Sequence, residues 1–150
     1  MLRRSARILA VGAAALAVAG GTGCGDSDEA GGDRRPLVTF GRTGGSEGRV
    51  YGLVVERGGG AYLTQYPDNS GKGKRFEVDG GKRDDLRSAL EDLDIKGLAP
   101  NYEPNPPTAE GHRYSVTYQG TTVQAAEKAD IPEDLKSVIE MLDGLVDDET

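Results

Sequence analysis

The sequence is poor in the residues on which most active sites depend. It has one histidine, His112, one cysteine, Cys24, and no tryptophan. Histidine is the usual general base and a common metal ligand, and cysteine is the typical ligand of structural zinc sites. One histidine without a cysteine partner or metal-binding spacing therefore argues against both a zinc site and a serine–histidine–aspartate triad. The plain interpretation of His112 is a half-exposed residue that opens a strand.

The sequence also lacks a nucleotide-binding loop and a pair of catalytic carboxylates. The glycines of residues 41–48 match neither common phosphate-binding pattern and lead into a predicted strand rather than a helix. Acidic pairs act as acid and base only where their environments separate their pKa values, and here they lie on predicted solvated faces or in a tail. We expect no catalytic residue, metal or cofactor, and the chain is not predicted to be an enzyme. The pairs are Asp84/Asp85, Glu91/Asp92 and Asp147/Asp148.

What the sequence does contain begins with an export signal. Arg3, Arg4 and Arg7 precede an uncharged run over residues 8–19, and small residues then lead into Cys24. This order is typical of a secretory signal peptide, and the run is shorter than the roughly 20 apolar residues of a transmembrane helix. We therefore predict a signal peptide over residues 1–23 and a mature protein outside the cytoplasm.

Cys24 is the predicted site of lipidation. The segment Gly21-Thr22-Gly23-Cys24 resembles a bacterial lipobox, although Gly21 stands where an aliphatic residue is usual. A lone cysteine in an exported chain has no disulfide partner, which favours palmitate attachment and a lipid anchor on the extracytoplasmic face of the cell membrane. The alternative is cleavage after the A-x-A sequence of residues 17–19, which would release a secreted protein with a free thiol.

The remainder reads as an acidic tether followed by one domain. Residues 24–35 combine glycines with four acids and predict a flexible tether, and residues 36–150 are the size of a single domain. Loss of the three leader arginines takes the formal net charge from −7 to −10. Like-charge repulsion then opposes binding to nucleic acid, or to a membrane other than through the lipid, and favours a cationic or uncharged protein partner.

Hydrophobic periodicity predicts an α+β domain. An antiparallel sheet in the order ββββαββα, with both helices on one face and no parallel crossover, accounts for the pattern. Residues 42–48 and 101–110 are predicted as loops, and Asp147, Asp148 and Glu149 as a frayed tail. The expected strands are 37–40, 50–57, 61–66, 74–78, 112–118 and 121–126, and the helices start after Gly81 and at Pro132.

The order of several short motifs is similar to one protein family. Residues 38–45, Val-Thr-Phe-Gly-Arg-Thr-Gly-Gly, resemble the opening of the emfourin family, protein inhibitors of thermolysin-like metalloproteases, which has an Arg-Ser-Gly-Gly type motif. Thr43 replaces the usual serine, and His112-Arg113 stands where an Asp-containing segment often lies. Further motifs follow in the family's order over residues 37–145: Leu93-Asp94-Ile95 ending a helix, a proline-containing loop, Tyr114-x-Val116 and Ile131-Pro132-Glu133-x-Leu135.

The resemblance implies a protein that binds a zinc metalloprotease and obstructs its cleft without a metal or cofactor of its own. It implies partner contacts for Arg42, Thr43, Gly44 and Gly45; the alternative for the two glycines is a purely structural role in shaping a turn. Tyr102, in the second loop, is expected to be exposed as an aromatic anchor. The alternative interpretation of the two loops is that they are ordinary connectors. The alternative function of the protein is that of a non-inhibitory envelope lipoprotein that binds another protein. The sequence does not predict the oligomeric state.

Overall fold

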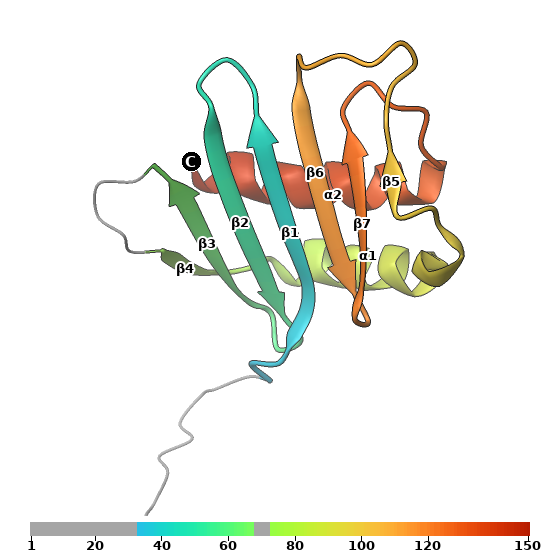
Figure 1. The fold of residues 1–150 in the computed structure, drawn as a ribbon. Helices are drawn as coiled ribbons and strands as arrows, with labels where there is room; N and C mark the ends of the chain where they lie inside the picture. Colours follow the sequence, from blue (N-terminus) through green and yellow to red (C-terminus); the bar gives the residue numbers. More distant parts are fainter. Residues whose placement is uncertain (1–32, 68–72) are drawn as a thin grey trace, which may run out of the picture.

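A computed structural model of the chain describes residues 33–67 and 73–150 (Figure 1). The predicted signal peptide, Cys24 and most of the predicted tether lie outside the described residues. Within the described residues, no helix is both long enough and apolar enough to cross a membrane.

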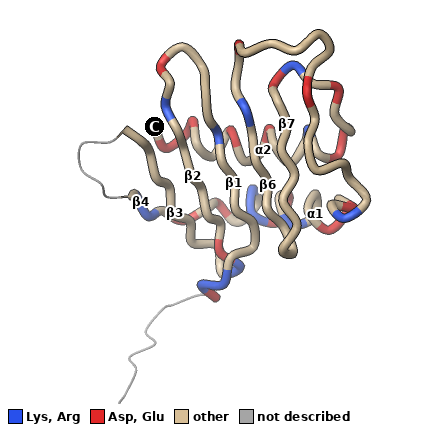
Figure 2. The backbone as a smooth tube through the Cα atoms, viewed as in Figure 1, with Lys and Arg blue, Asp and Glu red and all other residues tan. Residues whose placement is uncertain are grey.

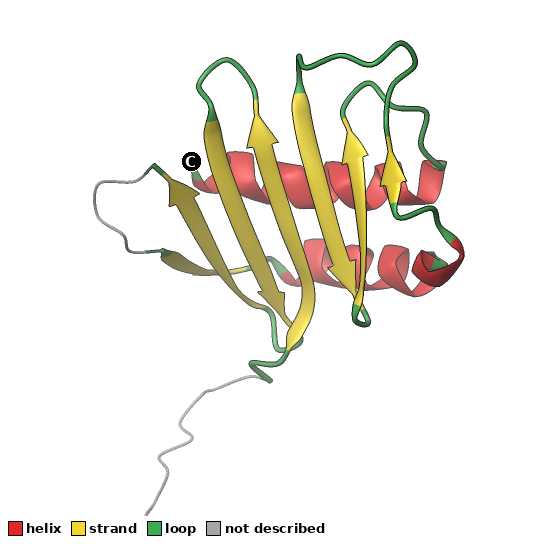
Figure 3. Cartoon of the chain, in the orientation of Figure 1, coloured by secondary structure: helices red, strands yellow, loops and turns green. Residues whose placement is uncertain are grey.

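The described chain forms one seven-stranded sheet and two α-helices, which makes it a mixed α+β fold (Figure 3). The strands lie in the order β4-β3-β2-β1-β6-β7-β5. Both helices lie behind the sheet in Figure 1, so one face is covered and the other is open. In chain order the elements are β1 (Pro36–Gly44), β2 (Arg49–Glu56), β3 (Gly60–Tyr66), β4 (Lys74–Glu77), α1 (Gly80–Asp92), a 3₁₀ turn (Ile95–Gly97), β5 (Asn101–Tyr102), β6 (His112–Tyr118), β7 (Thr121–Ala126) and α2 (Glu133–Glu149).

The prediction of a purely antiparallel sheet is wrong at one edge. β5 pairs with β7 in parallel, through Asn101 opposite Gln124 and Tyr102 opposite Ala125. The stretch that contains β5 was predicted to be loop, because a two-residue strand beside prolines has no hydrophobic period. The 3₁₀ turn after α1 contacts β7 and brings the chain to this edge, so the observed order adds a short strand to ββββαββα.

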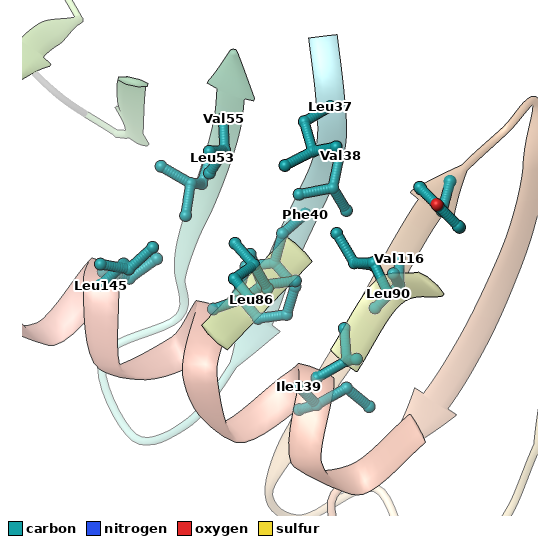
Figure 4. Packing of buried hydrophobic residues seen from close by; sticks show 14 of the residues in the cluster. Leu37, Val38, Phe40, Leu53, Val55, Leu86, Leu90, Val116, Ile139 and Leu145 are labelled. Atoms are coloured by element: carbon teal, nitrogen blue, oxygen red, sulfur yellow. The ribbon is translucent and has the colours of Figure 1, made fainter. Parts of the chain in front are cut away.

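The core fills the space between the sheet and the helices. Alternate residues of β1 and β2 point to the helices, among them Val38, Phe40 and Leu53, and all are buried. Figure 4 shows Phe40 beside Leu86 of α1, with Leu145 of α2 nearby. The apolar faces predicted for the two helices are confirmed, since Leu86, Leu90, Leu93, Leu135, Val138, Ile139, Leu142 and Leu145 are all buried.

Two predicted irregular segments are ordered elements. β1 continues through Arg42 to Gly44 rather than ending at Phe40, so the predicted loop of residues 42–48 shortens to a turn over residues 45–48. The predicted frayed tail is the last turn of α2, which extends to Glu149. Ion pairs bind this turn to three other elements: Arg42–Asp147 and Lys82–Asp148, both at 2.7 Å, and Lys74–Glu149, also at 2.7 Å.

Candidate binding surface at the loop end of the sheet

Three loops gather at one end of the sheet, which we call the loop end. They are the β1–β2 turn (residues 45–48), the β5–β6 loop (residues 103–111) and the β7–α2 loop (residues 127–132). Figure 1 shows all three at the top of the view, opposite the end where the chain enters β1. Thr43, Gly44 and Gly45 lie here and are exposed, as the sequence led us to expect of a recognition loop.

The β1–β2 turn has a backbone that only glycine adopts easily. Gly44 and Gly45 have φ of 96° and 74°, and the N–H of Gly45 donates a 3.3 Å hydrogen bond to the carbonyl of Gly111. A Cβ on Gly44 would lie 2.6 Å from that carbonyl oxygen, and one on Gly45 would lie 2.6 Å from Nε2 of His112. Both glycines therefore shape the turn and also leave its backbone accessible from outside.

His112 and Glu127 join the beginning of β6 to the β7–α2 loop. The backbone N–H of His112 donates to Oε2 of Glu127 at 2.7 Å, and the N–H of Glu127 donates to the His112 carbonyl at 2.8 Å. Nδ1 of His112 lies 3.4 Å from the same carboxylate oxygen. His112 is half-exposed and opens β6, as predicted, and its ring packs against Gly45.

An ion pair attaches the beginning of the β5–β6 loop to the sheet. The Arg113 guanidinium donates to both carboxylate oxygens of Glu103, at 2.6 and 2.8 Å. These hydrogen bonds, together with one from the Asn101 amide, hold the pKa of Glu103 below its ordinary value. The paired two-point geometry is more directional than a single contact, so it orients the loop where it leaves β5.

Arg42 lies beneath this surface rather than on it. Its side chain points to the helix face of the sheet, is buried, and donates from Nη1 to Asp143 and to Asp147 of α2, both at 2.7 Å. Its guanidinium also lies 4.6 Å from the centre of the Tyr51 ring. Burial alone opposes the charged form, but the two carboxylates outweigh it and raise the pKa of Arg42 above its ordinary value.

Tyr102 is not the exposed anchor that the sequence predicted. It is half-buried, packs against the core, and its hydroxyl accepts a hydrogen bond from the N–H of Ala99 at 3.1 Å. The aromatic residue exposed near the loop end is Tyr66, 72% accessible, which lies opposite Val50 in the β2–β3 register on the open face of the sheet. The alternation of β2 and β3 places both on one face, but their juxtaposition depends on a register that the sequence does not specify.

Tyr114 of β6 lies between Phe40 of β1 and Asp143 of α2. Its ring stacks on Phe40 with centroids 5.9 Å apart, and burial, followed by the negative charge of Asp143, raises its pKa to about 12. The neutral phenol is thus favoured in the folded state, whereas the unfolded chain ionises near the ordinary value of about 10. This contribution to stability is present below pH 10 and is lost as the pH rises towards 12.

We expect a separate ionisation step near pH 12 when phenolate absorbance is followed against pH, with circular dichroism as the check that the chain remains folded. The Tyr114→Phe variant should lose this step, and Tyr66→Phe should retain it. A single transition near pH 10 for all tyrosines of the folded wild type would contradict the assignment.

Comparisons of the chain with protein-family models, with curated proteins and with solved structures found no match.

The loop end offers several groups that can contact another molecule. In residues 33–67 and 73–150, no group of three or more histidine, cysteine, aspartate or glutamate side chains is placed to hold a metal ion. The surface instead offers an exposed turn backbone, the hydroxyl of Thr43 and the apolar pair of Val50 and Tyr66. Such groups recognise a protein through main-chain and apolar contacts.

Proposed function

We propose that this protein is an exported inhibitor of a thermolysin-like zinc metalloprotease, anchored by a lipid on Cys24, and that the loop end obstructs the protease cleft. The observation that carries the proposal is the exposed, held backbone of the β1–β2 turn. Thr43 to Gly48 are accessible, while Gly45 is hydrogen-bonded to Gly111 and packed on His112.

A held backbone matters because a protease cleaves segments that adapt to its active site. A turn that already has its bound shape loses little conformational entropy on docking, and it resists the extension that cleavage requires. The proposed contacts are therefore the exposed backbone of Gly44 and Gly45, the side chain of Thr43, and the neighbouring pair of Val50 and Tyr66. Arg42 supports this surface from beneath through α2 and is not itself a contact.

The test is a titration of the full chain against a panel of thermolysin-like proteases, with hydrolysis of a peptide substrate as the readout. We expect activity to fall in near-stoichiometric proportion to the added chain, which mass spectrometry should find intact afterwards. Thr43→Glu should weaken inhibition at least about tenfold, because it places an unpaired charge in a contact that excludes water.

Thr39→Glu is the matched control, since Thr39 is an exposed threonine on the same strand and the same face, four residues before Thr43. It should inhibit like the wild type. Digestion of the chain, absence of inhibition across the panel, or equal inhibition by Thr43→Glu would each contradict the proposal.

A second candidate is a non-inhibitory lipoprotein that binds another protein of the cell envelope. The burial of Arg42 favours it, because the resemblance to the inhibitor family implies an arginine contact that this residue does not make. Intact chain without inhibition, together with crosslinking of the loop end to one envelope protein, would support this candidate.

A further inference from the structure

The helix layer of the domain is acidic, whereas the central strands of the sheet carry few charges. α2 carries seven acidic residues but only one basic residue, Lys136, whereas β1, β3 and β7 contain no acidic residue. Figure 2 shows acidic residues along the helices behind the sheet and in the loops at the top of the view, while the central strands are mostly uncharged. A partner of the helix layer must therefore be compatible with a strongly negative surface.

A groove with an apolar floor crosses this acidic layer between α1 and α2. It has a volume of about 350 Å³. Leu86 and Leu145 form its floor, and Met141, 38% accessible, forms part of one wall. Methionine is a flexible and polarizable side chain that adapts to different apolar partners.

The rim of the groove has an excess of negative charge. Lys82 and Asp148 lie across it and neutralise each other at 2.7 Å. Asp85 and Glu140, the other charged residues of the rim, have no cationic partner within 4.0 Å in the part of the chain that the structure describes. The rim thus offers two carboxylates to an incoming cation.

Gly144 deepens the groove, and nothing in the fold of the domain requires a glycine at this position. It lies inside α2, where glycine is less favourable than alanine by about 1 kcal/mol. A Cβ built on Gly144 would meet nothing within 4 Å, so neither packing nor backbone shape calls for glycine here. Its missing side chain leaves open space above Leu86 and Leu145, which permits close approach by another molecule.

We propose that this groove binds a cationic amphipathic helix of a partner protein. Apolar side chains of the helix would occupy the floor beside Met141 and Gly144, and lysine or arginine residues flanking them would pair with Asp85 and Glu140. This is the geometry by which an amphipathic helix lies in an apolar groove. The site lies on the helix layer, away from the open sheet face, and does not depend on the proposed protease inhibition.

The probe is a fluorescein-labelled 18-residue peptide of leucine and lysine at helical spacing, titrated with the full chain and followed by fluorescence anisotropy. We expect saturable one-to-one binding that weakens as salt is added. Two comparison peptides, one with every lysine replaced by glutamate and one with every leucine replaced by serine, should bind at least about tenfold more weakly. If either comparison peptide bound as tightly as the leucine–lysine peptide, the proposal would be overturned, because binding would then not require both the positive charges and the apolar side chains.

Gly144→Gln provides the decisive variant, since it fills the groove without removing any contact of the domain. The melting temperature should not fall, while affinity for the leucine–lysine peptide should fall at least about tenfold. Ser137→Gln, an exposed position of α2 outside the groove, is the matched control and should bind like the wild type. Unchanged binding by a folded Gly144→Gln variant would overturn the proposal.

Discussion

Replacing Arg42 by methionine is expected to lower the free energy of unfolding by about 2–4 kcal/mol, as measured by urea denaturation. Methionine retains most of the apolar stem but leaves Asp143 and Asp147 without their cation, and removing one partner of a buried ion pair costs about 3–5 kcal/mol. The expected loss is smaller than that of a fully buried pair because one of the two carboxylates is exposed. Asp147 is 65% accessible and regains water, whereas Asp143 is 23% accessible and does not fully do so.

The position of the two aspartates on α2 adds to this effect. They lie in the C-terminal part of the helix, where the partial negative charge of the helix dipole opposes carboxylates, and the last turn has no basic residue of its own. Arg42 supplies from β1 the positive charge that the helix lacks.

Arg75→Met is the matched control. Arg75 also pairs with one carboxylate, that of Glu56 at 3.3 Å, and also lies over a tyrosine, 5.4 Å from the centre of the Tyr62 ring, but it is exposed. Exposed pairs contribute at most about 1 kcal/mol. Equal losses of unfolding free energy in the two variants would contradict the special role of Arg42. Replacing both Asp143 and Asp147 by asparagine should reduce the loss caused by Arg42→Met, and an unchanged loss would also contradict this role.

Replacing Gly44 by alanine is expected to destabilise the domain by about 2–3 kcal/mol and to weaken protease inhibition in parallel. An L-residue at φ of 96° is strained, and such strain costs about 1–3 kcal/mol. The new Cβ would also lie 2.6 Å from the backbone oxygen of Gly111, so the two loops would have to separate.

Gly48→Ala separates these two causes. Gly48 is the last residue of the β1–β2 turn and has φ of 60°, but a Cβ there would meet nothing within 4 Å. Its replacement should cost only the backbone term, about 1 kcal/mol. Chemical denaturation of both variants gives the comparison, and a Gly44→Ala loss no larger than that of Gly48→Ala would show that the contact with Gly111 is not tight.

The parts of the fold that periodicity encodes were predicted well. The bounds of β6 and β7 agree with the predicted strands, because residues 112–118 alternate cleanly and Gln119-Gly120 ends the first strand. The apolar faces of both helices were predicted for the same reason, since leucines recur at three and four residue steps.

The parts that depend on distant partners were not predictable. Arg42 interrupts the alternation of β1 with a charge on the core side, and its carboxylate partners lie more than a hundred residues later in the chain. The acidic end of α2 has the composition of a tail, but the lysines and arginine of other elements pair with it and Val146 is buried in the core. β5 is too short to carry any period.

The candidate site shows the same division. Thr43, Gly44 and Gly45 are exposed, as their composition indicated, although the first two end β1 and only Gly45 belongs to the turn. The family resemblance assigned Arg42 to the surface, and position in a loop assigned Tyr102 there. Arg42 instead pairs with two carboxylates of α2, and Tyr102 packs against the core. The pair of Val50 and Tyr66 was missed, since only the β2–β3 register brings the two together.

β1 sets a fixed distance between the point where the chain enters the domain and the loop end. The strand enters the fold at Pro36 and ends at Gly44 beside the β1–β2 turn, so its nine residues span about 30 Å from one end of the sheet to the other. A chain held to a surface by its N-terminal side would carry the loop end on the far side of this rigid strut. Shortening the tether would then bring the whole domain nearer the surface, while the reach contributed by the sheet itself would remain constant.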